Sequence, residues 1–276
     1  MKIRLSVQRL SAPAPVLFIG LAICFAYLTP ANKLSSASAQ AVAPNGSYGI
    51  LLNQWKDANS NNISAILGVL NFDGAGNVTG TYTLVTTKNP TAATGTWTGT
   101  YSGNPDGSNT VNLTFDVGGT ITAAVMVTDG GNALQILLTG GSLLKPGQVI
   151  NGTGRIQSAQ GSMPAGNYGY LINQWPDANN GPQGVFGLTY LDGAGKVFGF
   201  YTIAGNTGAS APLTGTLTGT YSVNPDSTGS ITINLDIGFT STYAMVVTDG
   251  GAGILTLLTG GTGGLKAVDS GFARMQ

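Results

Sequence analysis

The side chains of this chain that are best suited to catalysis or metal binding are carboxylates, and all eleven belong to aspartate. Histidine and glutamate are absent, and the single cysteine, Cys24, lies in an apolar run near the N-terminus. General acid–base and covalent catalysis depend mainly on such groups, placed within reach of one another. No serine stands in the Gly-x-Ser-x-Gly setting of a nucleophile elbow either. We therefore expect a protein that is not an enzyme.

Most of the aspartates stand in turn sequences. Calcium needs about six to eight oxygen ligands from a loop dense in carboxylates, whereas each of these turns contains one. Aspartate beside glycine is typical of tight hairpins, because aspartate bonds to nearby backbone and glycine adopts positive φ. Transition metals are bound mainly by histidine and cysteine side chains, which these turns do not contain. We therefore predict no metal and no cofactor. The turn aspartates are Asp73, Asp106, Asp129, Asp192, Asp226 and Asp249.

One further carboxylate lies in the sequence Asp269-Ser270-Gly271, which has the local form of an aspartic-protease loop. That chemistry needs two carboxylates that share a proton. The first half of the chain has Asn151-Gly152-Thr153 near the equivalent place, without an acid. Protease activity is therefore not expected.

The best candidates for binding are two copies of an Asn-Gln-Trp-x-Asp motif. An indole face beside amide and carboxylate groups suits a sugar ring or another small polar ligand. The structural alternative is that each tryptophan closes a barrel mouth or fills a contact between barrels, while the polar groups cap a loop. The candidate ligand-binding residues are Asn53, Gln54, Trp55 and Asp57 in the first copy, and Asn173, Gln174, Trp175 and Asp177 in the second.

These motifs belong to a unit that is written twice, since Gly46–Trp55 returns as the similar segment Gly166–Trp175. Within each unit, runs of alternating polar and apolar residues end at turn sequences, which indicates antiparallel strands joined in sequence. The first unit predicts strands over about 47–55, 63–72, 78–87, 95–103, 110–117, 121–128, 133–139 and 149–157. The second predicts them over about 167–175, 184–191, 196–204, 214–223, 230–237, 240–248, 253–259 and 267–276.

Eight strands in an open sheet would leave two exposed edges, and closure into a barrel removes both. The connections after even-numbered strands are tight and most of the others are longer, so loops gather at one end of each barrel. Closure would bring the last strand beside the first. We therefore expect Arg155 to stack on Tyr48, and Arg274 on Tyr168, in cation–π contacts of about 0.5–2 kcal/mol.

Gly46-Ser47-Tyr48 and Gly166-Asn167-Tyr168, with Arg155 and Arg274, resemble the lipocalin (calycin) signature of a first-strand Gly-x-Trp packed against a last-strand arginine. This chain has tyrosine where that family has tryptophan, and it lacks the family's N-terminal helix and disulfide signals. The resemblance implies a calycin-like barrel. Over most of its length the chain resembles more closely secreted bacterial proteins with tandem Asp-Gly-x-Gly, Gly-Thr-Tyr and Val-x-Asp-Gly-Gly motifs, a resemblance that brings no assigned activity.

The N-terminus has the form of a secretory signal peptide. Lys2, Arg4 and Arg9 precede an apolar run over 16–28, which is too short for a membrane-spanning helix, and small residues follow. Cleavage is expected near Ala39 or Ala41, which places the protein outside the cytoplasm, secreted or periplasmic. The expected organisation is a leader and short segment over 1–41, a first barrel over 42–157, a linker over 158–165 and a second barrel over 166–276.

The sequence thus predicts an all-β protein of two tandem eight-stranded antiparallel up-and-down barrels. We expect non-catalytic binding of a small polar, carbohydrate-like or lipidic ligand at the long-loop end, or a structural module that contacts a cell-surface component. A nucleic-acid partner is not expected because the chain has no basic stripe. Two alternatives remain: a sixteen-stranded outer-membrane pore and an adhesin-like pair of β-sandwiches.

Overall fold

The computed structural model describes residues 41–55, 63–87, 91–145, 147–157, 163, 165–176, 183–205, 212–262 and 267–276. Within these ranges the chain forms sixteen strands and two short 3₁₀ turns. The expected signal peptide, the Cys24 region and most of the predicted linker lie outside the described residues. No helix in the described part of the chain is long and apolar enough to cross a membrane.

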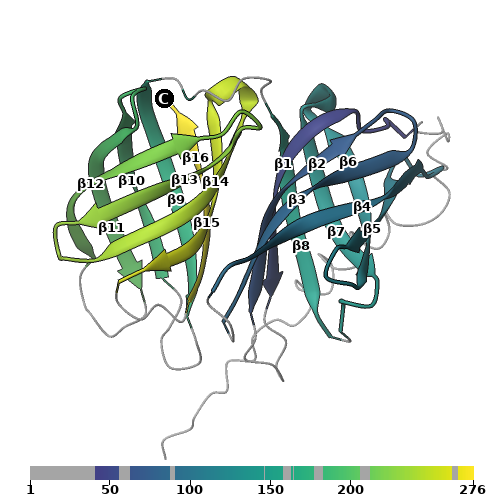
Figure 1. Cartoon of the computed structure of the whole chain (residues 1–276), viewed down its shortest axis with the longest axis horizontal. Coiled ribbons are helices and arrows are strands. Elements are labelled where there is room, and N and C mark those ends of the chain that lie inside the picture. The colour runs from purple at the N-terminus through teal and green to yellow at the C-terminus, as the bar shows by residue number, and fades with distance from the viewer. Residues whose placement is uncertain are drawn as a thin grey trace, which may run out of the picture. The chain divides into compact units, whose positions relative to one another are not determined.

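The first eight strands form one closed antiparallel barrel, and the last eight form another (Figure 1). The first barrel consists of β1 (Gly46–Trp55), β2 (Ser64–Phe72), β3 (Asn77–Thr86), β4 (Ala93–Gly103), β5 (Asn109–Phe115), β6 (Thr120–Thr128), β7 (Ala133–Gly140) and β8 (Val149–Ile156), with η1 (Asp129–Gly131) between β6 and β7. The second consists of β9 (Gly166–Pro176), β10 (Gln183–Leu191), β11 (Lys196–Gly205), β12 (Leu213–Val223), β13 (Thr228–Leu235), β14 (Thr240–Thr248), β15 (Gly253–Gly261) and β16 (Ala267–Met275), with η2 (Asp249–Gly251) between β14 and β15.

This topology confirms the predicted fold class. Each strand pairs with its neighbour in sequence, and closure comes from β1 with β8 and from β9 with β16. Two separately closed barrels contradict both the sixteen-stranded barrel and the pair of open sandwiches.

The interior of the first barrel is filled by aromatic side chains. Trp97 packs edge-on against Phe115, with ring centroids 5.5 Å apart, and Tyr82 packs against both. The indole Nε1 of Trp97 donates a hydrogen bond to the Val69 carbonyl at 2.9 Å, which satisfies a polar group that would otherwise be costly to bury. Such inward side chains alternate with outward ones along each strand, as a barrel wall requires.

Four of the six turn aspartates, Asp73, Asp106, Asp192 and Asp226, bond to the backbone of their own turns. In the β2–β3 turn, Asp73 Oδ1 accepts hydrogen bonds from the backbone N–H groups of Ala75, at 2.7 Å, and Asn77, at 2.9 Å. Asp192 makes the equivalent bonds in the second barrel, to Ala194 and Lys196. Hydrogen bonds to the ionised form hold the pKa of both carboxyls below its usual value. These contacts are those of the predicted hairpin turns.

The expected stacking of arginine on tyrosine is wrong, because the strand pairing differs by one residue from the pairing that would bring the two side chains together. Tyr48 lies opposite Ile156, whereas Arg155 lies opposite Gly49, and neighbouring positions of a strand face opposite sides of the wall. The Tyr48 ring is therefore inside the barrel, where its hydroxyl donates to the Gly131 carbonyl at 2.6 Å. The second barrel repeats this: Tyr168 is buried and donates to Gly251 at 2.7 Å, while Arg274 lies opposite Gly169.

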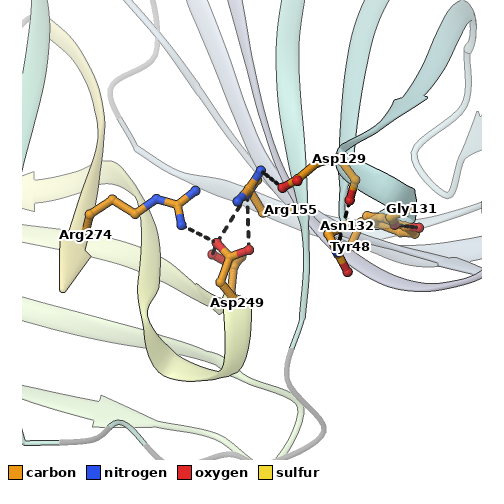
Figure 2. Close-up of polar contacts among 8 residues, drawn as sticks. Tyr48, Asp129, Gly131, Asn132, Arg155, Asp249 and Arg274 are labelled. Atoms are coloured by element: carbon orange, nitrogen blue, oxygen red, sulfur yellow. Dashed lines mark hydrogen bonds and ion pairs between the residues drawn. The ribbon is translucent and has the colours of Figure 1, made fainter.

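Arg155 instead joins the outsides of the two barrels. Its Nη1 is 3.0 Å from Asp129 Oδ2 in its own barrel, and its Nε is 3.1 Å from Asp249 Oδ1 in the second. Asp249 also accepts from Arg274 Nη1 at 3.1 Å. Figure 2 shows the two guanidinium groups on either side of the Asp249 carboxylate, with Tyr48 apart from them.

The two barrels belong to one compact unit, Gln40–Gln276, and they share an apolar cluster. From the first barrel this cluster takes outward residues of β1–β3, among them Leu51, Leu67 and Val69. From the second it takes Val246, Leu255, Leu257 and Val268 on β14–β16. Gly49 permits the close approach, because a Cβ there would lie 2.5 Å from Val246 Cγ1.

Candidate functional site

The Asn-Gln-Trp-x-Asp motifs are divided by the alternation of their strands. Asn53 faces outward, where its Oδ1 accepts a 2.7 Å hydrogen bond from Ser270 Oγ of the second barrel. Gln54 is buried inside the first barrel and accepts from the Ser64 hydroxyl. In the second barrel Asn173 is exposed, whereas Gln174 Nε2 donates to Asp269 Oδ2 at 3.3 Å. Neighbouring asparagine and glutamine side chains therefore do not form one platform.

The remaining members of the two motifs are not placed in a site. Trp55 and Trp175 lie in β1 and β9, and their side chains lie outside the described part of the structure, as do Asp57 and Asp177. Whether the tryptophans contact a ligand stays a prediction.

The partner of Gln174 marks a polar site inside the second barrel. Asp269 is 4 % exposed and lies opposite Gln174, on neighbouring strands. The residues on either side of it face outward: Val268 joins the cluster between the barrels, and Ser270 bonds to Asn53. Asp269 therefore points into the barrel, two positions from the point where β16 begins at Ala267.

The Asp269 carboxyl is only partly satisfied. Its Oδ2 accepts from Gln174, while its Oδ1 has no hydrogen-bond partner among the described residues. Burial raises the pKa of Asp269 to about 7, and the hydrogen bond from Gln174 opposes that shift. A buried carboxylate with a free oxygen is costly, so this group favours either a proton or a ligand that donates a hydrogen bond.

Tyr243 lies close enough to interact electrostatically with this carboxyl, and Tyr170 interacts with Tyr243. Burial raises the pKa of Tyr243 on β14, and the negative charge of Asp269 raises it further. Burial also raises the pKa of Tyr170 on β9, whose hydroxyl donates to the Phe200 carbonyl at 3.2 Å. Both phenols therefore stay neutral, and both hydroxyls already have partners, Phe200 for Tyr170 and Ser241 for Tyr243.

The first barrel is apolar at the same positions. Gln54 lies opposite Ile150, just as Gln174 lies opposite Asp269, so register makes Ile150 the counterpart of Asp269. Ile150 belongs to the apolar core. By the same matching of strands, Ala123 is the counterpart of Tyr243, and Ile50 that of Tyr170. Three inward positions have thus become polar in the second barrel.

The aromatic side chain that covers the inward glycine of the second strand comes from a different strand in each barrel. Trp97 on β4 covers Gly68 in the first barrel, where a Cβ would lie 2.9 Å from the indole. The second barrel has Leu217 in place of Trp97, and Tyr170 on β9 covers the equivalent Gly187, with its hydroxyl 2.7 Å from a built Cβ. The second barrel is therefore not a copy of the first in its interior.

Sequence reasoning singled out Asp269 only as half of a protease motif and missed its surroundings. A signal was present: aligning the two units shows an aspartate where an inward isoleucine stands. By contrast, the hydroxyls of Tyr101 and Tyr221, which have no partner among the residues that the structure describes, occur at equivalent positions in both barrels, which indicates a shared structural feature. The difference between the copies is what marks the Asp269 site.

Comparisons with known proteins add little to this geometry. No protein-family model matches the chain, and no curated protein sequence does. A solved structure of a protein with unknown function from the DUF3598 family of Nostoc punctiforme PCC 73102 is similar over 84% of this chain and 96% of that one, at 9% sequence identity and a TM-score of 0.25. A TM-score of this size does not establish a common fold.

Proposed function

We propose that the protein is a non-catalytic binding protein whose second barrel holds a small ligand beside Asp269. The observation that supports this is a buried carboxyl whose Oδ1 has no partner in the described part of the chain, in a barrel whose sister has isoleucine at the same place. Small barrels commonly hold one small ligand in this way. The first barrel, filled by Trp97 and its aromatic neighbours, would serve as a structural partner.

The chemistry of the site indicates the class of ligand. A group that donates hydrogen bonds, above all an amine, suits the carboxylate, because charge-assisted hydrogen bonds are the stronger ones. The ring of Tyr243 suits an apolar or sugar-like face next to that group. The ligand of this proposal is therefore a small amine or amino sugar. With the leader described above, the protein would bind it outside the cytoplasm.

Titration calorimetry with hexylamine and glucosamine tests this proposal, with glucose as the probe that lacks the amine. At pH 8, above the pKa of Asp269, we expect both amines to bind and glucose to bind more weakly. Asp269→Asn should weaken amine binding about tenfold, the effect of losing one charge-assisted hydrogen bond.

Asp226→Asn is the matched control, because it removes one carboxylate from an exposed turn of the same barrel. Its affinity for both amines should equal that of the unchanged chain. If neither amine binds, the proposed function is wrong. If both bind with equal affinity to the Asp269→Asn chain, the site is wrong.

A further inference from the structure

The contact between the two barrels joins two different surfaces. We call the outward residues of β1–β3, and of the equivalent β9–β11, the front face of a barrel. The outward residues of β6–β8, and of β14–β16, are its rear face. Within the chain, the front face of the first barrel packs on the rear face of the second. A contact between unlike surfaces is heterologous, and it leaves one surface of each kind uncovered.

The front face of the second barrel carries an apolar patch that continues onto Phe272 of the neighbouring strand β16. Leu171 lies opposite Phe186 on one side and Phe272 on the other, and the next strand adds Phe200. Leu171 and Phe186 hold the positions of Leu51 and Leu67, which are buried between the barrels. The exposed fractions of this patch are 39% for Leu171, 56% for Phe186, 46% for Tyr190, 46% for Phe198, 64% for Phe200 and 47% for Phe272. Exposed apolar patches of this kind mark interaction surfaces.

The rear face of the first barrel carries the matching residues. Met126, Leu137 and Val149 are 50%, 47% and 50% exposed. Register places them where the second barrel has Val246, Leu257 and Val268, all of which are buried in the contact between the barrels. Each end of the chain thus presents the apolar half of a contact that the chain already makes once.

The charges at the two ends are complementary in the same way. Arg155 binds the turn aspartate of its own barrel, Asp129, and that of the next barrel, Asp249. Arg274 binds the turn aspartate of its own barrel, Asp249, and its side chain is 46% exposed. The Asp129 side chain is 57% exposed. A following copy would place its Asp129 where Asp249 lies against Arg155.

The second barrel also has a glycine at the position where a second contact of this kind would need space. A Cβ on Gly49 would lie 2.5 Å from Val246 Cγ1 and 2.9 Å from Thr248 Cγ2, so the contact needs glycine there. The second barrel has Gly169 at this position, where a Cβ would meet only Gln276 Nε2, at 3.2 Å. Gly169 therefore has room for the residue that corresponds to Val246, which is Met126 of another copy.

We propose that copies of this chain associate head to tail, with the front face of the second barrel on the rear face of the first barrel of the next copy. The intermolecular contact repeats the contact within the chain: aromatic and aliphatic side chains in the middle, and Arg274 bridging to Asp129 of the neighbour at the edge. Repetition of such a contact gives a ring or an open chain of copies.

Cysteine cross-linking tests this geometry. A Cβ on Gly49 would lie 3.4 Å from Val246 Cβ, close to the separation in a disulfide. In a Cys24→Ser background, Gly49→Cys with Val246→Cys should therefore form a disulfide within one chain. The test variant, Gly169→Cys with Met126→Cys, should form disulfides between chains and give a ladder of covalent oligomers on a non-reducing gel.

If the control pair forms its disulfide and the test pair stays monomeric, the proposal is wrong. Dimers from Gly169→Cys alone would show front-to-front pairing, which also contradicts it.

Sedimentation velocity without cross-links gives a second test. Phe186→Asp blocks the front face and Leu137→Asp blocks the rear face, and both side chains are exposed, so neither change disturbs a core. Each variant alone should be monomeric, and an equal mixture should form a dimer and nothing larger. Val117→Asp, an exposed apolar residue in the β5–β6 turn, should assemble like the unchanged chain.

A chain that stays monomeric without substitution overturns the proposal. So does co-sedimentation with phosphatidylcholine vesicles that Phe186→Asp abolishes while the chain shows no self-association, since that result would assign the patch to lipid.

Discussion

At the scale of single residues, the two barrels differ most where side chains point inward. Asp269 and Ile150 occupy matched places, yet one is a carboxyl with an oxygen that no described residue pairs with, and the other is part of an apolar core. The carboxyl contributes little to folding, because burying its ionised form without a full set of partners is unfavourable. A residue that costs stability and has no counterpart in the first barrel is the basis of the binding site proposed above.

This cost makes stability depend on pH in a defined direction. The pKa of Asp269 rises from 3.8 to about 7 on folding, so the folded state binds the proton more tightly than the unfolded state. Its contribution to stability is therefore complete below about pH 4 and is lost as the pH rises towards 7, by up to about 1.4 kcal/mol per pH unit. Asp269→Asn should abolish this loss, so the variant should gain stability relative to the unchanged chain over that range.

Urea unfolding at several pH values measures the difference. The comparison with the variant is needed because exposed carboxyls such as Asp73 and Asp116 have lowered pKa values and act in the opposite direction. A difference between the two chains that does not change from pH 4 to pH 7 would contradict a buried, poorly partnered Asp269.

At the scale of strands and turns, local sequence signals predicted most of the fold. Alternating runs and Asp-Gly turns act over a few residues, and they placed all sixteen strands near their observed bounds. The stacking of Arg155 on Tyr48 was wrong because pairing β8 with β1 one residue differently exchanges the inner and outer faces.

The sequence patterns left the packing of the two barrels on each other undetermined, although β2 carried a signal. Its residues 65–70 are buried on both faces, and such an unbroken apolar run is typical of a strand covered on both sides. Which surface covers it depends on residues far along the chain, and alternation within one strand cannot show that. The Asp269 site was missed for the same reason, since barrel closure is what brings Gln174 on β9 opposite Asp269 on β16.

The β6–β7 turn offers a test of how glycine shapes these connections. Gly130 has φ +63 and Gly131 has φ +102, and a Cβ on either would meet nothing within 4 Å. Any loss of stability on substitution therefore reports backbone strain alone. Gly130→Ala should cost about 1–2 kcal/mol, the cost of the left-handed region. Gly131→Ala should cost more, up to about 3 kcal/mol.

Chemical denaturation of the two variants checks this order. Gly250→Ala in the matching β14–β15 turn, with φ +68, serves as a control and should behave like Gly130→Ala. Equal effects at Gly130 and Gly131 would show that φ does not set the cost.

At the scale of the whole molecule, one contact between unlike barrel faces organises the chain. It buries Leu51, Leu67 and Leu257, which would otherwise be exposed on barrel walls. Burial of aliphatic side chains contributes about 1.5–3 kcal/mol each, so each barrel should be less stable without the other. The ion pairs of Arg155 lie at a partly exposed edge and set the orientation more than the strength of the contact.

Separating the barrels tests this. Fragments 42–157 and 163–276, produced apart, should each show β-structure by circular dichroism and should melt at lower temperatures than the intact chain. Mixed, they should form a one-to-one complex that restores part of the lost stability. Leu67→Asp in the first fragment should prevent the complex, while Val117→Asp should not. Fragments that melt at the temperature of the intact chain would show that the contact contributes no stability.

Gly49, and Gly169 at the equivalent position of the second barrel, also bear on how the gene could gain further repeats by duplication. Duplicating one more unit would extend the array without any new surface having to evolve, since the incoming barrel would find its docking partner already encoded. In this proposal, the number of repeats and the ligand can change independently, because assembly depends on the outside of each barrel wall and the proposed ligand site on a few side chains inside it.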